Sequence, residues 1–282
     1  MIRSRIPGPI RVVLLMLALA SELRAQGVVV APHTVFIDHR ARSGQLSLYN
    51  PGNDPVEISV GIFFGYPVSD SAGSFELHTV DTPDSTMPSA AGWIQAFPRI
   101  ITLGARETQV VRLLARPPAG LADGEYWARL TVSARSQAPA VSPQRDSAGV
   151  SIGLNLEVRT VLPLLYRKGL VATGIRVDSL ALARAPGDSL EVRAHLTRSG
   201  NSAFLGMIRA AVVDSAGKSV ATIKSPIAVY FDMSPRIRVA APPLAPGRYR
   251  LQLEIASDRD DLQPKDILTI APVRDSLEVR LP

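Results

Sequence analysis

Residues 149–168 read GVSIGLNLEVRTVLPLLYRK, and this stretch decides the fold class. Aliphatic side chains occupy every second position of its first half, with polar or small residues between them: Val150, Ile152, Leu154, Leu156 and Val158. A period of two is the signature of a β-strand, whose successive side chains point to opposite faces. The stretch therefore predicts a long strand over 150–166 with one aliphatic face. Alternation alone is equally typical of a strand whose apolar face is covered within its own sandwich.

The same periodicity runs through most of the chain and predicts an all-β protein. Turn chemistry separates the runs, as in Asn50-Pro51-Gly52-Asn53. Before the long strand we expect strands at 28–30, 35–37, 46–49, 56–60, 93–97, 108–114 and 125–134. After it we expect strands at 190–196, 207–213, 219–223, 227–231, 236–239, 249–256 and 267–270. About seven short strands per unit is typical of an immunoglobulin-like β-sandwich. The stretch nearest to a helical pattern is 180–185.

The length of 282 residues fits two such sandwiches in tandem after a leader. Arg3, Arg5 and Arg11 precede the apolar run 12–20, which is followed by small residues at possible cleavage sites after Ala20 or Ala25. Nine apolar residues are too few to cross a bilayer core of about 30 Å, so the pattern favours a signal peptide. We predict a signal peptide at 1–25, a first domain at 26–167 and a second at 168–282. The mature chain is expected in the periplasm without an integral membrane segment.

Composition excludes several functional classes. Lys and Arg number 31 and Asp and Glu 25, but the basic residues are scattered among acidic ones, so no nucleic-acid partner is expected. The chain has no cysteine, which excludes thiol catalysis and cysteine-bound metal. Two sandwiches of this size can be held together by their hydrophobic cores without disulfides.

Motifs for catalysis or metal binding are also missing from the sequence. The four histidines are isolated in the chain: His33, His39, His78 and His195. No serine lies in Gly-x-Ser-x-Gly, and Gly217-Lys218-Ser219 lacks the first glycine of a phosphate-binding loop. The acidic run at 258–261 lacks the glycine and distal glutamate of a calcium loop. We predict a binding protein rather than an enzyme, with no metal and no cofactor.

Several segments, in order and spacing, resemble the first domain of PapD-like periplasmic pilus chaperones over residues 28–168. The segments are LSLYNPG at 46–52, residues 93–104 with Phe97-Pro98 and Leu103-Gly104, QVVRL at 109–113, GEYW at 124–127 and LLYR at 164–167. The second domain resembles that family only as an immunoglobulin-like module.

The resemblance implies a chaperone whose first domain ends in an exposed edge strand. That strand lends alternating aliphatic side chains to an incomplete exported subunit, which is β-augmentation. It assigns Val150, Ile152, Leu154, Leu156 and Val158 to client contact, with pilin-like subunits as partners and an outer-membrane usher as a further partner. It also implies that Glu125 and Arg167 pair near the domain junction, where the alternative is two unrelated surface charges.

One departure from the family concerns its basic pair, which holds the client's C-terminal carboxylate. The corresponding positions here are Thr34 and Pro163, neither of which carries a cation. Arg159, Arg167 and Lys168 lie nearby in the sequence as substitutes. The competing hypothesis is a structural or adhesive immunoglobulin-like module without chaperone activity, in which the row from Val150 to Val158 is covered.

Overall fold

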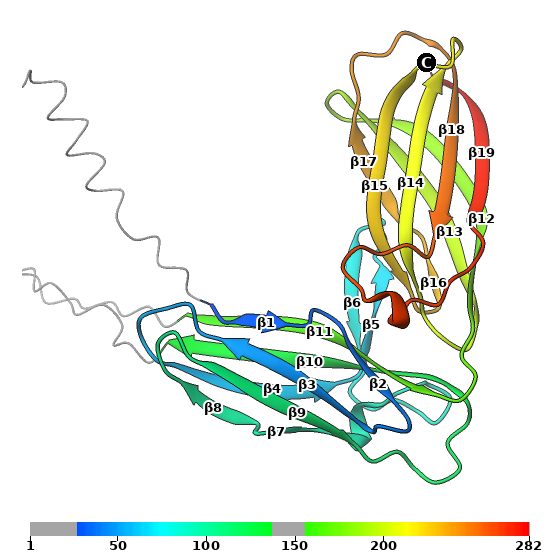
Figure 1. The fold of residues 1–282 in the computed structure, drawn as a ribbon. Coiled ribbons are helices and arrows are strands. Elements are labelled where there is room, and N and C mark those ends of the chain that lie inside the picture. The colour runs from blue at the N-terminus through cyan, green and yellow to red at the C-terminus, as the bar shows by residue number, and fades with distance from the viewer. Residues whose placement is uncertain (1–26, 137–155, 282) are drawn as a thin grey trace, which may run out of the picture.

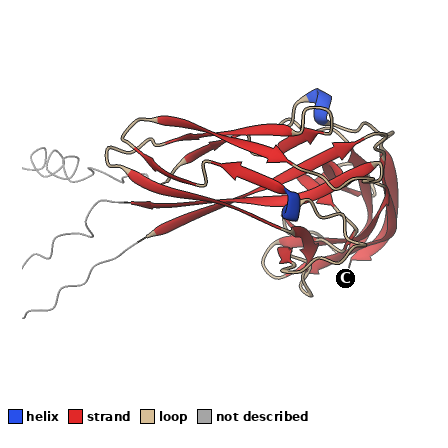
Figure 2. Cartoon of the chain, turned by 90° about the horizontal axis from the view of Figure 1, so that it is seen from below, coloured by secondary structure: helices blue, strands red, loops and turns tan. Residues whose placement is uncertain are grey.

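The structure, a computed structural model, describes residues 27–136 and 156–281, which form an all-β chain of two sandwiches (Figure 1). The predicted fold class is confirmed. Strands and loops make up nearly all of the described chain, with two short 3-10 turns, η1 (Ala91–Trp93) and η2 (Pro264–Asp266) (Figure 2). Within the described ranges, no helix has the length and apolar character needed to cross a membrane. The predicted signal peptide and Val150, Ile152 and Leu154 lie outside the described residues.

The first sandwich has two main sheets. One has the order β1-β3-β9-β7, with bounds β1 (Val29–Ala31), β3 (Ser43–Tyr49), β9 (Thr108–Ala115) and β7 (Ile94–Phe97). The other has the order β2-β11-β10-β4-β8, with bounds β2 (Val35–Asp38), β11 (Glu157–Lys168), β10 (Gly124–Ser136), β4 (Val56–Phe63) and β8 (Ile100–Leu103). The inward rows of both sheets form one core that includes Leu46, Leu113, Leu130 and Leu164, all fully buried.

The first strand segment changes sheet part-way along. β1 pairs antiparallel with β3, whereas β2, which begins four residues later, pairs parallel with the end of β11. The register of the second pairing runs only from Val35 opposite Leu164 to Asp38 opposite Arg167. The sheet switch therefore determines how much of β11 has a neighbour on both sides.

The second sandwich also consists of two sheets and has its own hydrophobic core. One sheet joins β12 (Thr173–Ala185), β13 (Ser189–Gly200), β16 (Asp232–Met233) and β17 (Arg236–Ala240). The other has the order β15-β14-β18-β19, with bounds β15 (Ser219–Val229), β14 (Phe204–Asp214), β18 (Gly247–Ala256) and β19 (Val273–Leu281). Tyr249, Leu251, Leu253 and Ile255 of β18 alternate into the core, as their spacing predicts. The predicted domain limits, 26–167 and 168–282, stay a prediction.

Two strand predictions in this half are wrong, and a third stretch, for which no element was predicted, forms a strand. Residues 180–185, the stretch nearest to a helical pattern, belong to strand β12, which pairs with β13 along its whole length. Residues 219–223 and 227–231 are not two strands, because β15 runs through Pro226 to Val229 as one edge strand. Residues 267–270 form no strand, although Ile270 packs against the core. The sequence pattern did not predict β8, β12, β19 or the hairpin of β5 (Gly65–Ser69) and β6 (Phe75–Thr79).

The two sandwiches meet at an angle, with the β5–β6 hairpin of the first standing beside β15 of the second (Figure 1). A separate apolar cluster fills the junction, with Phe64, Trp127 and Leu165 from the first sandwich and Ala203 and Tyr230 from the second. The hairpin adds two hydrogen bonds: the Arg236 N–H donates to the Gly73 carbonyl at 2.9 Å, and the Ser234 N–H donates to the side-chain Oγ of Ser69 at 3.1 Å. Burial and hydrogen bonds therefore both join the two units.

Candidate functional site

Strand β11 has a complete neighbour on one side only. It pairs with β10 along its full described length, from Lys168 opposite Gly124 to Glu157 opposite Arg135. On its other side β2 pairs only with Leu164 to Arg167. Within the described residues, 157–163 therefore present an open strand edge.

The two faces of β11 look onto different surroundings. Leu162, Leu164 and Tyr166 point into the core of the first sandwich and are buried. The residues between them point to the opposite side, where Leu165 is buried in the junction cluster and Val161 remains 39% exposed. The even-numbered row is thus the core row, and the odd-numbered row faces the second sandwich.

The predicted client-contacting residues belong to the even-numbered row. Val158 is half-buried and Leu156 is 49% exposed, just before β11 begins. Val150, Ile152 and Leu154 fall outside the described residues. The assignment of all five to client contact stays a prediction.

Glu125 and Arg167 lie opposite each other on β10 and β11. Arg167 Nε donates to Glu125 Oε2 at 2.7 Å, and the Glu125 side chain is fully buried. The other carboxylate oxygen, Oε1, accepts from Trp127 Nε1 at 2.9 Å and from the backbone N–H of Ala203 at 3.0 Å. Arg167 Nη1 donates to the carbonyl of Asp266 at 2.7 Å. Both residues of the pair thus reach the second sandwich, which is where a pair that fixes the angle between the units would act.

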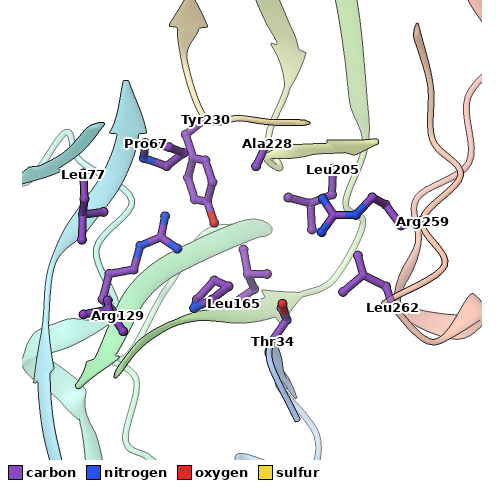
Figure 3. A pocket seen from close by; sticks show the side chains of 12 residues that line it. Thr34, Pro67, Leu77, Arg129, Leu165, Leu205, Ala228, Tyr230, Arg259 and Leu262 are labelled. Carbon is purple, nitrogen blue, oxygen red and sulfur yellow. The ribbon is translucent and has the colours of Figure 1, made fainter. Parts of the chain in front are cut away.

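A cleft of about 300 Å³ lies between the sandwiches, beside the odd-numbered row of β11. Its lining is mostly apolar and comes from six strands and the loops next to them (Figure 3): Thr34, Pro67, Leu77, Arg129, Val161, Pro163, Leu165, Leu205, Ala228, Tyr230, Arg259 and Leu262. Thr34 and Pro163, the positions of the family's basic pair, both line it. The two positions that the resemblance assigns to the basic pair thus lie beside one cleft, although neither residue carries a charge.

The three cations considered as substitutes all have other partners. Arg159 binds Glu157 at 3.1 Å and is exposed, and Arg167 is held by Glu125. Lys168 donates to the carbonyl of Leu121 and to Asp123. None of the three is among the residues that line the cleft.

The cleft instead contains Arg129, which the sequence analysis missed. Arg129 lies directly across from Pro163 on the neighbouring strand, so its side chain projects on the same face of the sheet as position 163. The available signal was an arginine at an odd position of β10, on the same face as Glu125 and Trp127 and on the face opposite to Ala128 and Leu130. Using that signal requires knowledge of the register between β10 and β11.

The guanidinium of Arg129 is buried and only partly satisfied. Nε donates to the carbonyl of Gly65 at 2.9 Å, and the guanidinium carbon lies 4.9 Å from the centre of the Tyr230 ring. Its Nη2 is buried and has no hydrogen-bond partner among the described residues. Burial raises the pKa of Tyr230, so its phenol stays protonated and offers no negative charge to Arg129. Figure 3 shows the guanidinium directed toward Tyr230.

No group of three or more His, Cys, Asp or Glu side chains is placed to hold a metal ion in the described part of the chain.

No protein-family model matches this chain, and no curated protein matches it in sequence. Similar solved structures include the YadV chaperone, which is 15% identical with a TM-score of 0.44, covering 89% of this chain and 99% of that one. The Salmonella enterica SafA pilin in complex with the SafB chaperone is 16% identical with a TM-score of 0.42, and the match covers 91% of this chain and 99% of that one. The CsuC–CsuE chaperone–tip subunit complex of Acinetobacter baumannii is 12% identical with a TM-score of 0.44, and the match covers 91% of this chain and 99% of that one. Pilus chaperones, the family that the sequence resembles, are thus among the solved structures similar to this chain.

Proposed function

We propose that this protein is a periplasmic chaperone that binds exported, pilin-like subunits by strand addition along the open edge of β11. The observation that carries the proposal is the edge at residues 157–163, which β2 leaves unpaired on the side away from β10. Export rests on the predicted signal peptide at 1–25, and an outer-membrane usher is a further proposed partner.

An open edge is a binding surface because its backbone N–H and C=O groups point outward without partners. Main-chain hydrogen bonds to an added strand would supply affinity, and alternate side chains would supply selectivity. Leu156 and Val158 lie at the outer end of the core row, where an added sandwich could cover them. Continued through Leu154, Ile152 and Val150, the same row would reach the client's open core.

The edge carries features that limit unspecific pairing. Glu157 is flanked by Arg135 at 2.6 Å and Arg159 at 3.1 Å, which places a charged cluster at the outer end of β11. Pro163 at the inner end has no backbone N–H to donate. Charges and proline on an edge disfavour self-association, so a cognate partner has to complement both.

The test is co-expression with an exported subunit encoded beside the gene for this protein. The double variant Leu154→Glu and Leu156→Glu should abolish co-purification of the subunit, because it places two carboxylates in the apolar row. The control is Val110→Glu, which makes the same change at a 42% exposed aliphatic residue on β9, in the other sheet. Circular dichroism checks that each variant folds.

Loss of capture in the double variant with retention in the control supports strand addition. Capture that survives the double variant refutes it and favours the structural or adhesive module. The same experiment read by hydrogen exchange should show protection of the amides of 157–162 when the subunit is bound.

A further inference from the structure

The chain crosses from the first sandwich to the second through residues 169–172, between the end of β11 and the start of β12. No residue of this crossing is buried, and Leu170 is 85% exposed. Apolar packing therefore does not hold the crossing in place. Its conformation depends on hydrogen bonds instead, because a segment with few buried apolar contacts opens easily.

Asn201, in the turn between β13 and β14, supplies most of these hydrogen bonds. Its side-chain Oδ1 accepts from the Ala172 N–H at 2.8 Å, and its Nδ2 donates to the Leu170 carbonyl at 3.0 Å. Its backbone N–H donates to the Ala172 carbonyl at 3.0 Å. The crossing is thus bonded at two points to one residue of the second sandwich.

Asn201 is also bonded to the first sandwich. The Glu125 N–H, at the start of β10, donates to the Asn201 carbonyl at 2.9 Å, and Asn201 Nδ2 also donates to the Asp123 carbonyl at 3.3 Å. Asp123 Oδ2 in turn accepts from the Leu170 N–H at 3.2 Å. The amide and backbone groups of Asn201 therefore connect three segments, namely the start of β10, the crossing and the β13–β14 turn.

We infer that Asn201 is a positioning residue that holds the joint between the sandwiches in one conformation, so that their angle is set before any partner binds. The ion pair of Glu125 and Arg167 acts at the buried side of the joint, whereas Asn201 acts on the exposed crossing. A hinge needs only a few loop residues whose backbone angles can change, and residues 169–172 are such a segment once Asn201 releases them. A fixed angle avoids the entropy cost of ordering two units when a partner contacts both. The inference does not depend on the proposed strand addition.

Limited trypsin digestion measures how firmly the crossing is held, because Lys168 directly precedes it and trypsin cleaves after lysine. The bond from Lys168 to Gly169 should resist cleavage in the wild type, since proteolysis of a folded chain requires local opening. Asn201→Ala removes three side-chain hydrogen bonds and keeps the backbone ones, so cleavage at this bond should become about 10-fold faster or more. Asn201→Asp should accelerate it at least as much, because a carboxylate cannot donate to the two carbonyls. Mass spectrometry identifies the fragment that begins at Gly169.

A distance measurement tests the angle itself. The chain has no native cysteine, so spin labels can be attached at Gln45→Cys on β3 and Thr222→Cys on β15, both exposed positions, one in each sandwich. Electron paramagnetic resonance should give one narrow distribution of label distances in the doubly labelled protein. Adding Asn201→Ala should give a clearly wider distribution, because the sandwiches then sample several angles.

Asn53→Ala is the matched control, because Asn53 lies in an exposed turn of the first sandwich and accepts a hydrogen bond from Arg106 at 3.2 Å. It should change neither the cleavage after Lys168 nor the label distances. Circular dichroism checks that each variant folds, and Asn201→Asp is read in place of Asn201→Ala if the latter does not. The inference is overturned if both readouts in the Asn201 variant equal those of Asn53→Ala. A wide distance distribution in the protein that retains Asn201 also overturns it.

Discussion

Arg167→Met tests whether the buried pair joins the two sandwiches. The substitution keeps an unbranched side-chain stem but removes the 2.7 Å contact with Glu125 and the 2.7 Å bond to the carbonyl of Asp266. It also removes the stacking of Arg167 on Phe36, whose ring centre lies 4.5 Å from the guanidinium carbon. Glu125 would remain as a fully buried carboxylate.

Breaking a buried pair by removing one partner costs about 3–5 kcal/mol. Glu125 keeps two donors, Trp127 Nε1 and the Ala203 N–H, so we expect the lower end, about 3 kcal/mol. For a chain of this size, 1 kcal/mol shifts the melting temperature by about 2–4 °C, which gives a loss of about 6–12 °C. Glu125→Gln combined with Arg167→Met should cost less than the sum of the two single changes, because no buried charge remains in the double variant.

The measurement is calorimetry of the wild type, both single variants and the double variant. The control is Arg250→Met, which breaks an ion pair with Glu278 of similar length, 2.6 Å, between exposed side chains on β18 and β19. Exposed pairs contribute about 0–1 kcal/mol. If Arg167→Met costs no more than Arg250→Met, the argument from burial is refuted.

Two further predictions concern the junction and the acidic loop after β18. Gly73 has φ +76°, and a Cβ there would lie 2.2 Å from Arg236 Cγ, whereas Gly120 has φ +72° with open space around it. Gly120→Ala should therefore lower the free energy of unfolding by about 1–2 kcal/mol through backbone strain. Gly73→Ala should lower it clearly more, as measured by urea unfolding, because it also disturbs the contact between the hairpin and Arg236. Equal losses would show that this contact is unimportant. A hydrogen bond from Arg259 lowers the pKa of Asp261, and a hydrogen bond from Arg209 lowers the pKa of Asp258. Both carboxylates therefore stabilise the folded state fully at a pH above their pKa in the unfolded chain. This contribution is lost as the pH falls through their lowered pKa in the folded chain. Urea midpoints measured from pH 7 to 3 should fall less steeply for Asp261→Asn than for the wild type, and identical slopes would contradict this assignment.

The sequence was sufficient for the all-β class because a period of two is a local property. β9 and β18 show it clearly, with Val111 and Leu113 or Leu251 and Leu253 at alternate positions on the core side. The pattern predicted no strand at residues 180–185, where the local composition and the observed pairing disagree. Residues 180–185 contain Leu, Ala and Arg, which favour helices, but pairing with β13 overrides that weak preference.

Other local errors have equally specific causes. In the stretch 267–270, Ile270 packs against the second core without joining a ladder, and its N–H donates to Ser257 Oγ instead of to a strand. The β5–β6 hairpin contains Pro67, which weakens a strand pattern, and its role is to contact the second sandwich.

The candidate site was only partly predictable because its parts meet across the sheet. The open row could be read along one strand, and the positions of Thr34 and Pro163 followed from the resemblance. Arg129 could not be assigned in this way, because its relation to Pro163 is a cross-strand register between residues 34 positions apart. Spacing along the chain does not encode that register.

The open edge and the cleft are consecutive parts of one surface. A polypeptide added along residues 157–163 must end where β2 takes over the pairing, opposite Leu164. That point lies beside Thr34, the residue before β2, and beside Pro163, whose cross-strand neighbour is Arg129. β11 runs toward the cleft, so an added strand that runs parallel to it would bring its C-terminus there, whereas an antiparallel strand would bring an amino group to an unneutralised arginine. Electrostatics therefore favours a parallel direction for the proposed added strand.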